Sequence, residues 1–360
     1  MNNIRKSMRN LIVFLLVFAM TLGDGGLLSF AAIKTGAGPR IEQNKELFKE
    51  AEAEESEELL ASYDYEELAD YVAKKLVKRE TSIDISSYNL SSAAEVSFYE
   101  RMINTHAELF FVEYDDSSDV TFTQDSSGNY CISISPNYKS EYNERQSIDF
   151  EKYVKLILLG VDSSWSDVEK ILYLHDYLIT HCECVDYVEN SEKSNAYSAI
   201  VQGKADCLGY SMAFLYLMEK IGVEAGVVSS ASLDIAWNYV ILDGKRYYVD
   251  VAMDDPDNKV EFYCGHKWLL NGKNKCATGH ESIDWQDVDE KNLYEEATDN
   301  TKYDSFFWTD VESAIPYLDN KWYYVDADTP YVGNLVLKSF DLSSESNETV
   351  CTAGNKDQFW

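Results

Sequence analysis

The feature that most constrains the fold is a β-hairpin turned at Asp243-Gly244. Residues 236–242 run toward this pair, residues 245–251 run away from it, and both stretches are rich in aromatic and β-branched side chains. An Asp-Gly pair is favoured in two-residue type I′ turns, in which both residues take positive φ. A turn of that length also fixes the strand register, so Leu242 is predicted to face Lys245.

Counting back along this register places Trp237 opposite Asp250. Ile235 is then diagonal to Asp250 on the same face of the sheet, within reach of a long or aromatic side chain. A histidine at position 235 would therefore be held and oriented by the Asp250 carboxylate.

A helix carrying a cysteine precedes the hairpin. Cys207 begins an apolar helical stretch, Lys220 lies in its last turn, and Gly222 is a natural stop. The start of a helix lowers the pKa of a thiol and offers backbone N–H groups to an oxyanion. Asp206 acts in the opposite direction, because a neighbouring anion disfavours the thiolate.

The order and spacing of these motifs, from about Glu169 to Pro256, resemble the transglutaminase-like superfamily of bacteria and archaea. The motifs are His175-Asp176-Tyr177-Leu178, Ala196-Tyr197, Gly203-Lys204, Cys207-x-Gly209-Tyr210, Ala236-Trp237-Asn238, Tyr247-Tyr248-Val249-Asp250 and Asp254-Asp255-Pro256. The resemblance covers about a quarter of the chain. Residues Leu68–Tyr142 resemble, more weakly, the upstream region of such clostridial-type proteins.

The resemblance implies a papain-like cysteine fold and thiol acyl transfer. Cys207 would be the nucleophile and Asp250 the residue that orients the catalytic histidine. Trp237 and Tyr210 are expected near a substrate. The histidine itself should directly precede Ala236-Trp237-Asn238, and this chain has Ile235 there.

Isoleucine can neither accept nor donate a proton, and loss of one triad member lowers turnover by roughly 10³ to 10⁶-fold. Nothing in the hairpin register brings another histidine to Asp250, so structural or surface roles are expected for the others: His106, His175, His181, His266 and His280. Cys207 is either a residual reactive thiol or a small buried hydrophobe. Asp250 is either part of a site or a carboxylate bonded to backbone or to the Trp237 indole.

The sequence therefore predicts an α+β fold with a transglutaminase-like core, an upstream α/β region and a short β-rich tail. Helices are expected at Leu68–Leu76, near Glu95–Leu109 and at Ser163–Ile179, with Ser166 and Glu169 as a capping box. Strands are expected at Phe110–Tyr114 and Tyr130–Ile134. The predicted divisions are 1–31 (signal peptide), 32–62 (acidic linker), 63–160 (upstream region), 161–290 (transglutaminase-like domain) and 291–360 (tail).

The first residues predict export. A basic start is followed by an apolar run, Leu11–Leu22, and by the small-x-small pattern Ser29-Phe30-Ala31. An uncleaved membrane anchor is the alternative, although the run is short for a span. Cleavage after Ala31 removes three basic residues and one acidic one, which takes the net charge from −32 to −34. A charge so negative excludes nucleic acid and anionic membranes as partners, and a secreted or cell-surface location in a bacterium is expected.

Seven cysteines remain after cleavage, and an odd number leaves at least one unpaired or bridged to another chain. Cys207 is the expected unpaired thiol. The pairs Cys264-x-His266 and Cys276-x-x-x-His280 suggest zinc, but their spacing fits no common zinc pattern. A disulfide or plain surface positions are preferred for them, and neither metal nor cofactor is predicted.

The tail predicts a second hairpin, from Ala314 to Asp326, turned at Asp319-Asn320, with a further strand from Val332 to Leu342. It resembles one blade of the Trp- and Tyr-rich repeats of bacterial surface proteins, and one blade cannot bury its own faces. Three aromatic residues of the tail would either bind sugar or form strand core, the latter being preferred: Trp308, Trp322 and Tyr331.

Three functions follow from these features. The first is a degenerate, secreted binding module for a protein or peptide, which keeps the cleft without the chemistry. The second is a thiol acyltransferase or cysteine peptidase that uses Cys207 with a displaced base. The third is an adhesion or cell-wall interaction protein.

Overall fold

The computed structural model describes residues 65–88, 98–99, 102–103, 105–113, 119–124, 126, 130–185, 193–230, 235–255, 263–280, 298–327 and 334–355. The predicted signal peptide and acidic linker lie outside these ranges. These described residues belong to one compact unit. In the ranges given, no helix has both the length and the apolar character to cross a membrane.

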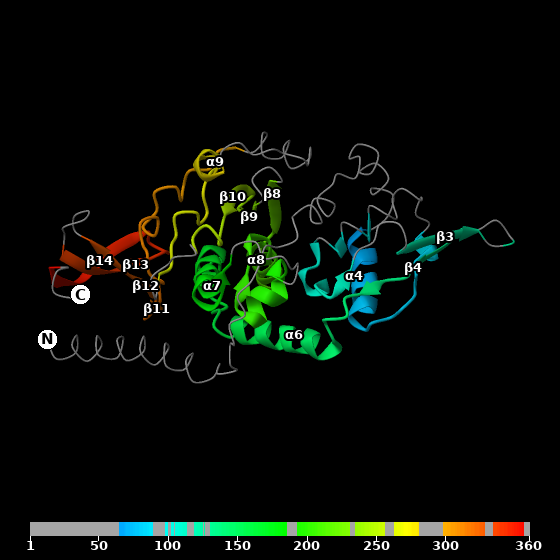
Figure 1. Cartoon of the computed structure of the whole chain (residues 1–360). Coiled ribbons are helices and arrows are strands. Elements are labelled where there is room, and N and C mark those ends of the chain that lie inside the picture. Colours follow the sequence, from blue (N-terminus) through cyan, green and yellow to red (C-terminus); the bar gives the residue numbers. More distant parts are fainter. Residues whose placement is uncertain are drawn as a thin grey trace. The chain divides into compact units, whose positions relative to one another are not determined.

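The upstream region is a mixture of short elements around α4 (Tyr65–Val77), which confirms the predicted helix (Figure 1). The others are β1 (Ile83–Asp84), the 3-10 helices η1 (Ser86–Tyr88) and η2 (Ala107–Leu109), β2 (Val112–Glu113), β3 (Val120–Gln124), β4 (Tyr130–Ile134) and β5 (Asn137–Tyr138). One sheet has the order β1-β4-β3, and β2 pairs with β5. The strand predicted at Tyr130–Ile134 is β4. The strand predicted from Phe110 is shorter, because Phe110 and Phe111 form a turn and bury their rings in the core.

Two capped helices lead into the central part of the chain. Helix α6 (Glu144–Leu158) was not predicted from the sequence, although Asn143 and Gln146 form a capping box at its start. The next helix, α7 (Asp167–His181), was predicted. Both hydrogen bonds of its Ser166–Glu169 capping box are present. Each box satisfies backbone N–H groups that a helix start leaves open.

The cysteine helix and the hairpin form the central layer. After β6 (Glu183–Cys184), the π-helical turn η4 (Ser198–Gln202) and β7 (Lys204–Ala205) comes α8 (Cys207–Ile221), which ends at Gly222 with φ +77°. The sheet has the order β10-β9-β8, with β8 (Ala225–Ser230), β9 (Ile235–Leu242) and β10 (Lys245–Val249) antiparallel (Figure 1).

The predicted hairpin register is confirmed. Leu242 pairs with Lys245, and Asp243 and Gly244 have φ of 51° and 69°. These two positive values are what a type I′ turn requires, so the local sequence alone sets the alignment of β9 with β10.

Different elements pack on the two faces of this sheet. Helix α8 packs on one face, where the Asn238 side-chain amide donates to the Ser211 carbonyl. On the opposite face, Trp237 and Tyr248 form a small buried cluster with Val228 and with Cys276 of α9 (Lys273–Gly279).

The chain reaches that second face by running along β10. The Asp250 N–H donates to the Trp268 carbonyl, and Tyr248 and Asn271 exchange backbone hydrogen bonds. Helix α9 begins directly after this bridge and lies against β10. This path carries the end of α9, and with it His280, over the hairpin.

A four-stranded antiparallel sheet forms the tail: β11 (Tyr317–Leu318), β12 (Lys321–Ala327), β13 (Asn334–Asp341) and β14 (Ser346–Asn355). Asp319 and Asn320 make the predicted turn, with φ of 50° and 62°. Trp322 donates its indole N–H to Glu169 at 3.1 Å, so the sheet packs on the start of α7. Trp308 and Trp322 are buried, so core packing rather than exposed sugar contact is confirmed for both, although only Trp322 lies in a strand and Trp308 lies in a turn. Tyr331 lies outside the described residues. The fold is α+β, as predicted.

Candidate functional site

Cys207 lies at the first position of α8, as the sequence predicts. Asp206 is the N-cap, and its carboxylate accepts the Gly209 N–H. Burial raises the pKa of the Cys207 thiol to about 12, and the negative charges of Asp206 and Asp250 act in the same direction. The N–H groups of Ala236 and Leu208 bond to the sulfur and act in the opposite direction. The thiol thus contacts β9 at the backbone N–H of the residue that directly follows Ile235.

The carboxylate of Asp250 is bound by a histidine that the sequence analysis placed elsewhere. His280 Nε2 lies 2.9 Å from Asp250 Oδ2, and the Met253 N–H donates to Oδ1 at 2.9 Å. The expectation that no histidine reaches Asp250 is therefore wrong. The hairpin register could not reveal this contact, because α9 brings His280 in from outside the hairpin. The alternative that Asp250 bonds backbone is correct for Oδ1.

His280 uses its other ring nitrogen within α9. Nδ1 lies 2.8 Å from the Cys276 carbonyl oxygen and 3.5 Å from the Cys276 sulfur. Its ring also packs against the Trp237 indole, with centroids 4.3 Å apart. Both ring nitrogens thus face acceptors, and each must carry a proton.

The charges of this group follow from that geometry. Burial alone would lower the pKa of His280, but the hydrogen bond to Asp250 and the contact with Cys276 raise it to about 10. Burial raises the pKa of Cys276, and the contact with His280 lowers it. The arrangement at neutral pH is an imidazolium paired with Asp250, beside a thiol.

Cys276, His280 and Asp250 are nevertheless closed off from solvent. Their exposed fractions are 2%, 1% and 4%. Their connectivity is that of a thiol–imidazole–carboxylate triad, with sulfur on one ring nitrogen and carboxylate on the other. The i, i+4 spacing of Cys276 and His280 was the visible sequence signal, since residues four apart on a helix are neighbours.

Ile235 packs against the cluster of Val228, Trp237, Tyr248 and Cys276. An apolar side chain therefore packs at position 235, on the sheet face that α9 covers, and the equivalence of this position to the family's histidine stays a prediction.

Trp237 and Tyr210 are both buried. The Tyr210 hydroxyl donates to Asp255 at 2.5 Å, and Trp237 packs under His280. The structure gives both a packing role, and contact with a substrate stays a prediction for them.

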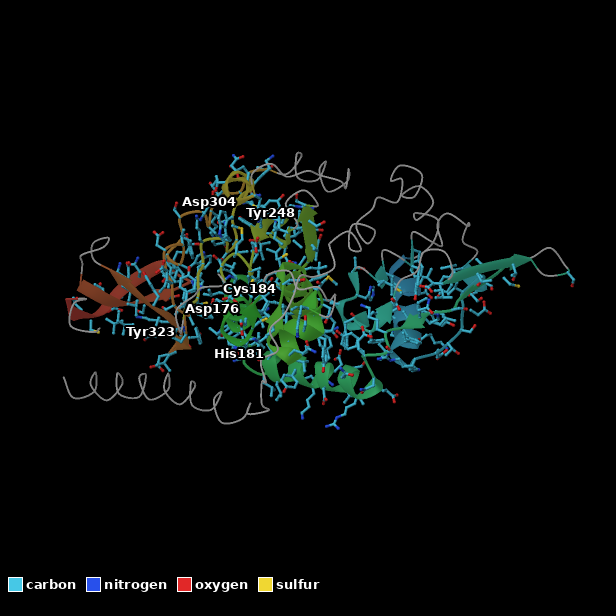
Figure 2. All side chains as sticks on the ribbon, in the orientation of Figure 1. Asp176, His181, Cys184, Tyr248, Asp304 and Tyr323 are labelled. Carbon is cyan, nitrogen blue, oxygen red and sulfur yellow. The ribbon has the colours of Figure 1, made fainter. Side chains whose placement is uncertain are left out.

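The remaining cysteine–histidine pair is also in the interior. Cys264 and His266 are buried, and Cys264 and Cys276 both carry free thiols. A disulfide or a surface position for these residues is therefore wrong. His266 instead bonds Asp176, which lies on α7 together with His181 (Figure 2).

Comparison with known proteins agrees with this architecture. Residues 160–269 match the family model of the transglutaminase-like superfamily. This stretch contains α7, α8, the hairpin and the segment up to Leu269. The chain therefore contains a transglutaminase-like domain. No curated protein matches the chain.

Two solved structures are similar in part. One, described as a TGase, is 15% identical with a TM-score of 0.29, and the match covers 39% of this chain and 45% of that chain. The other is described as a "putative cysteine protease" from Cytophaga hutchinsonii. It is 12% identical with a TM-score of 0.25, and the match covers 37% of this chain and 61% of that chain. This chain thus spans less than two thirds of either.

Proposed function

We propose that this transglutaminase-like domain is a binding module that has lost thiol acyl transfer. One observation carries the proposal: the Asp250 carboxylate, which would orient a catalytic histidine from position 235, is bound by His280 instead. The second ring nitrogen of His280 faces the Cys276 carbonyl. An imidazole held at both nitrogens in this way cannot take a proton from Cys207 without leaving these partners.

The state of Cys207 supports the same proposal. A nucleophilic cysteine needs a low pKa or an adjacent base. Burial, Asp206 and Asp250 raise the pKa of Cys207 to about 12, so at pH 7 it is a thiol rather than a thiolate.

The proposed setting is outside a bacterial cell, with a protein or peptide as the partner. The predicted export signal and the strongly negative charge support this setting. The same charge disfavours nucleic acid and anionic membranes.

A second candidate function is thiol acyl transfer with a displaced base. The observation in its favour is His280 itself, an imidazole bound to Asp250 through Nε2, with the Cys276 sulfur 3.5 Å from its other ring nitrogen. In that case the reactive thiol would be Cys276 or Cys207, and the buried site would have to open.

The test combines activity with thiol mapping. The full chain is incubated with a glutamine-containing peptide and a fluorescent primary amine, and in parallel with a limiting amount of iodoacetamide at pH 7. We expect no amine incorporation and slow alkylation of both cysteines. Turnover that Cys207→Ala or Cys276→Ala abolishes would contradict the binding module, and the sensitive variant would identify the nucleophile.

Restoring the family's histidine tests the geometry separately. Ile235→His alone should leave Cys207 alkylation unchanged, because Asp250 is already bound. Ile235→His combined with His280→Ala frees the carboxylate, and alkylation should then accelerate about tenfold or more, as expected when a thiol gains an imidazole base. Equal rates in both variants, with the fold retained by circular dichroism, would refute the proposed role of His280.

A further inference from the structure

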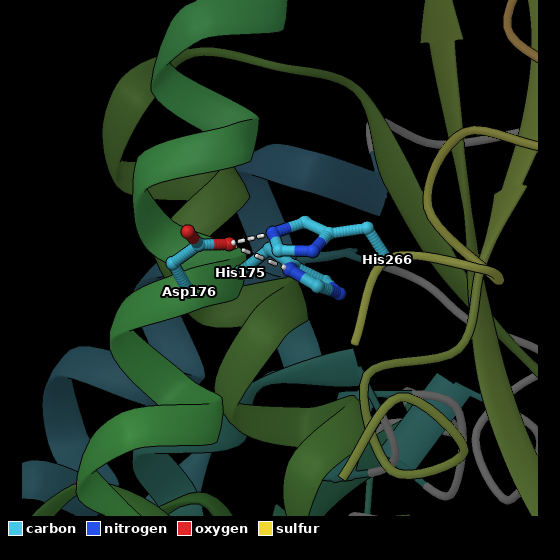
Figure 3. Close-up of side chains that lie close together, drawn as sticks. All are labelled: His175, Asp176 and His266. Atoms are coloured by element: carbon cyan, nitrogen blue, oxygen red, sulfur yellow. Dashed lines mark hydrogen bonds and ion pairs between the residues drawn. The ribbon is translucent and has the colours of Figure 1, made fainter. Parts of the chain in front are cut away.

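Three side chains meet in the core between α7 and the segment that follows the hairpin. His175 Nδ1 and His266 Nε2 lie 3.1 Å and 2.8 Å from the same oxygen, Asp176 Oδ1. All three residues are buried, and their ligand-type atoms lie within 4.8 Å of one another. Figure 3 shows both rings turned toward the Asp176 carboxylate.

The outer nitrogen of each ring is held by an acceptor. His175 Nε2 faces Asp254 Oδ2 at 3.2 Å, and His266 Nδ1 faces the Val311 carbonyl at 2.9 Å. An acceptor at the outer nitrogen fixes the proton there in a neutral imidazole, and metal-binding histidines are oriented in this way. The other Asp176 oxygen, Oδ2, accepts the Ile315 N–H.

If both rings were neutral, with the outer nitrogens protonated, the inner nitrogens would present lone pairs to a carboxylate oxygen. Three electron-rich atoms cannot converge in a dry interior without a cation among them. The cation is either a proton on each ring or a single metal ion.

Cys264 offers a fourth donor. It is fully buried near the Asp176 carboxylate, and its sulfur, which is outside the group of atoms that lie within 4.8 Å of one another, would have to move toward them to bind the same ion. The sequence placed Cys264 two residues from His266 but could not join this pair to α7. Two imidazoles, one carboxylate and one thiolate make a donor set that suits four-coordinate Zn²⁺.

We propose that His175, Asp176, Cys264 and His266 form a structural zinc site. Zn–N and Zn–O bonds of about 2.0–2.1 Å and a Zn–S bond of about 2.3 Å place tetrahedral ligands about 3.3–3.6 Å apart. The two inner nitrogens therefore need to move only a few tenths of an ångström from Asp176 Oδ1. Zinc would replace the protons of the metal-free network and deprotonate the thiol.

The site is closed, because four protein donors leave no position for substrate. Its role is to join α7 to residues 264–266, while Asp254, Val311 and Ile315 hold the ligands in place. The zinc site does not depend on whether Cys207 is catalytic, so its test is independent of the test of the proposed function.

Metal content of the full chain tests the proposal. The chain is produced without a histidine tag in zinc-supplemented medium, dialysed, and analysed by mass spectrometry for metals. We expect about one zinc per chain, lost in His266→Gln and Asp176→Asn and retained in His181→Gln, which alters another histidine of α7. Removing zinc with a chelator should lower Tm by about 5 °C, and added zinc should restore it.

Cobalt substitution tests the ligands by spectroscopy. It does not require that variants of the ligands on α7 remain folded. Tetrahedral Co²⁺ should give intense visible bands, and Cys264→Ser should remove the sulfur-to-cobalt charge-transfer band. The proposal is overturned if the wild type contains no stoichiometric zinc and its Tm is unchanged by the chelator. Protons would then hold the two histidines and Asp176 together. It is equally overturned if folded Asp176→Asn binds as much zinc as the wild type.

Discussion

Replacing His280 by glutamine tests the buried ion pair that His280 forms with Asp250. Glutamine keeps a side chain of similar reach and one hydrogen-bond donor, but it removes the cation that faces Asp250. The carboxylate is 4% exposed, so almost no solvent replaces the lost partner.

The expected cost is several kcal/mol. The pKa of His280 is raised from 6.5 to about 10, and a difference of that size corresponds to about 5 kcal/mol. Breaking one side of a buried pair costs about 3–5 kcal/mol in general. The amide of glutamine recovers part of this, so His280→Gln should lower the free energy of unfolding by about 3 kcal/mol at pH 6.

The pH dependence gives the effect a signature. Because the folded pKa is raised, the imidazolium contributes its full stabilisation below about 6.5 and loses it as pH rises through about 10. The wild type should therefore lose stability relative to His280→Gln across that window. A mere packing defect would cost the same at every pH.

Urea denaturation followed by tryptophan fluorescence at pH 6, 8 and 10 measures this difference, with His106→Gln as the matched control. Groups that titrate in both proteins cancel in the comparison. A difference below about 1 kcal/mol at pH 6, the size of an exposed pair, or one that does not shrink by pH 10, would refute the ion pair.

Three further predictions concern other elements. The rate of Cys207 alkylation should keep rising through pH 10, because its pKa is raised to about 12, and a plateau below pH 8 would show an activated thiol. Gly279→Ala should destabilise the end of α9, because an added Cβ would lie 2.2 Å from the Trp268 ring, and amide hydrogen exchange in α9 should rise. Trp322→Phe keeps an aromatic ring but removes the N–H bond to Glu169, so thermal unfolding should show a loss of about 1–2 kcal/mol. An unchanged Tm would place the tail sheet elsewhere than on α7.

Local signals in the sequence predicted the elements on which the site is built. The Asp243-Gly244 turn set the register of β9 and β10, and Ser166 with Glu169 marked the start of α7. Cys207 and Gly222 marked the start and end of α8. Each of these signals acts through residues a few positions apart, where backbone geometry permits only a few arrangements.

The partner of Asp250 was beyond such signals. His280 follows Asp250 by thirty residues, and their contact depends on the bridge between Tyr248 and Asn271 that turns the chain back over the sheet. An isolated backbone bridge has no periodic side-chain pattern, so a sequence search cannot detect it.

The same limit explains the cluster of His175, Asp176 and His266. Asp176 and His266 are ninety residues apart, and spacing rules for metal sites consider donors that are close along the chain. The sequence by itself determined which residues could supply ligand atoms, together with the helix and strands that carry them. Only the tertiary structure decided which of those atoms meet, because meeting requires the packing of α7 against a segment whose path is set by long-range contacts and not by its own residues.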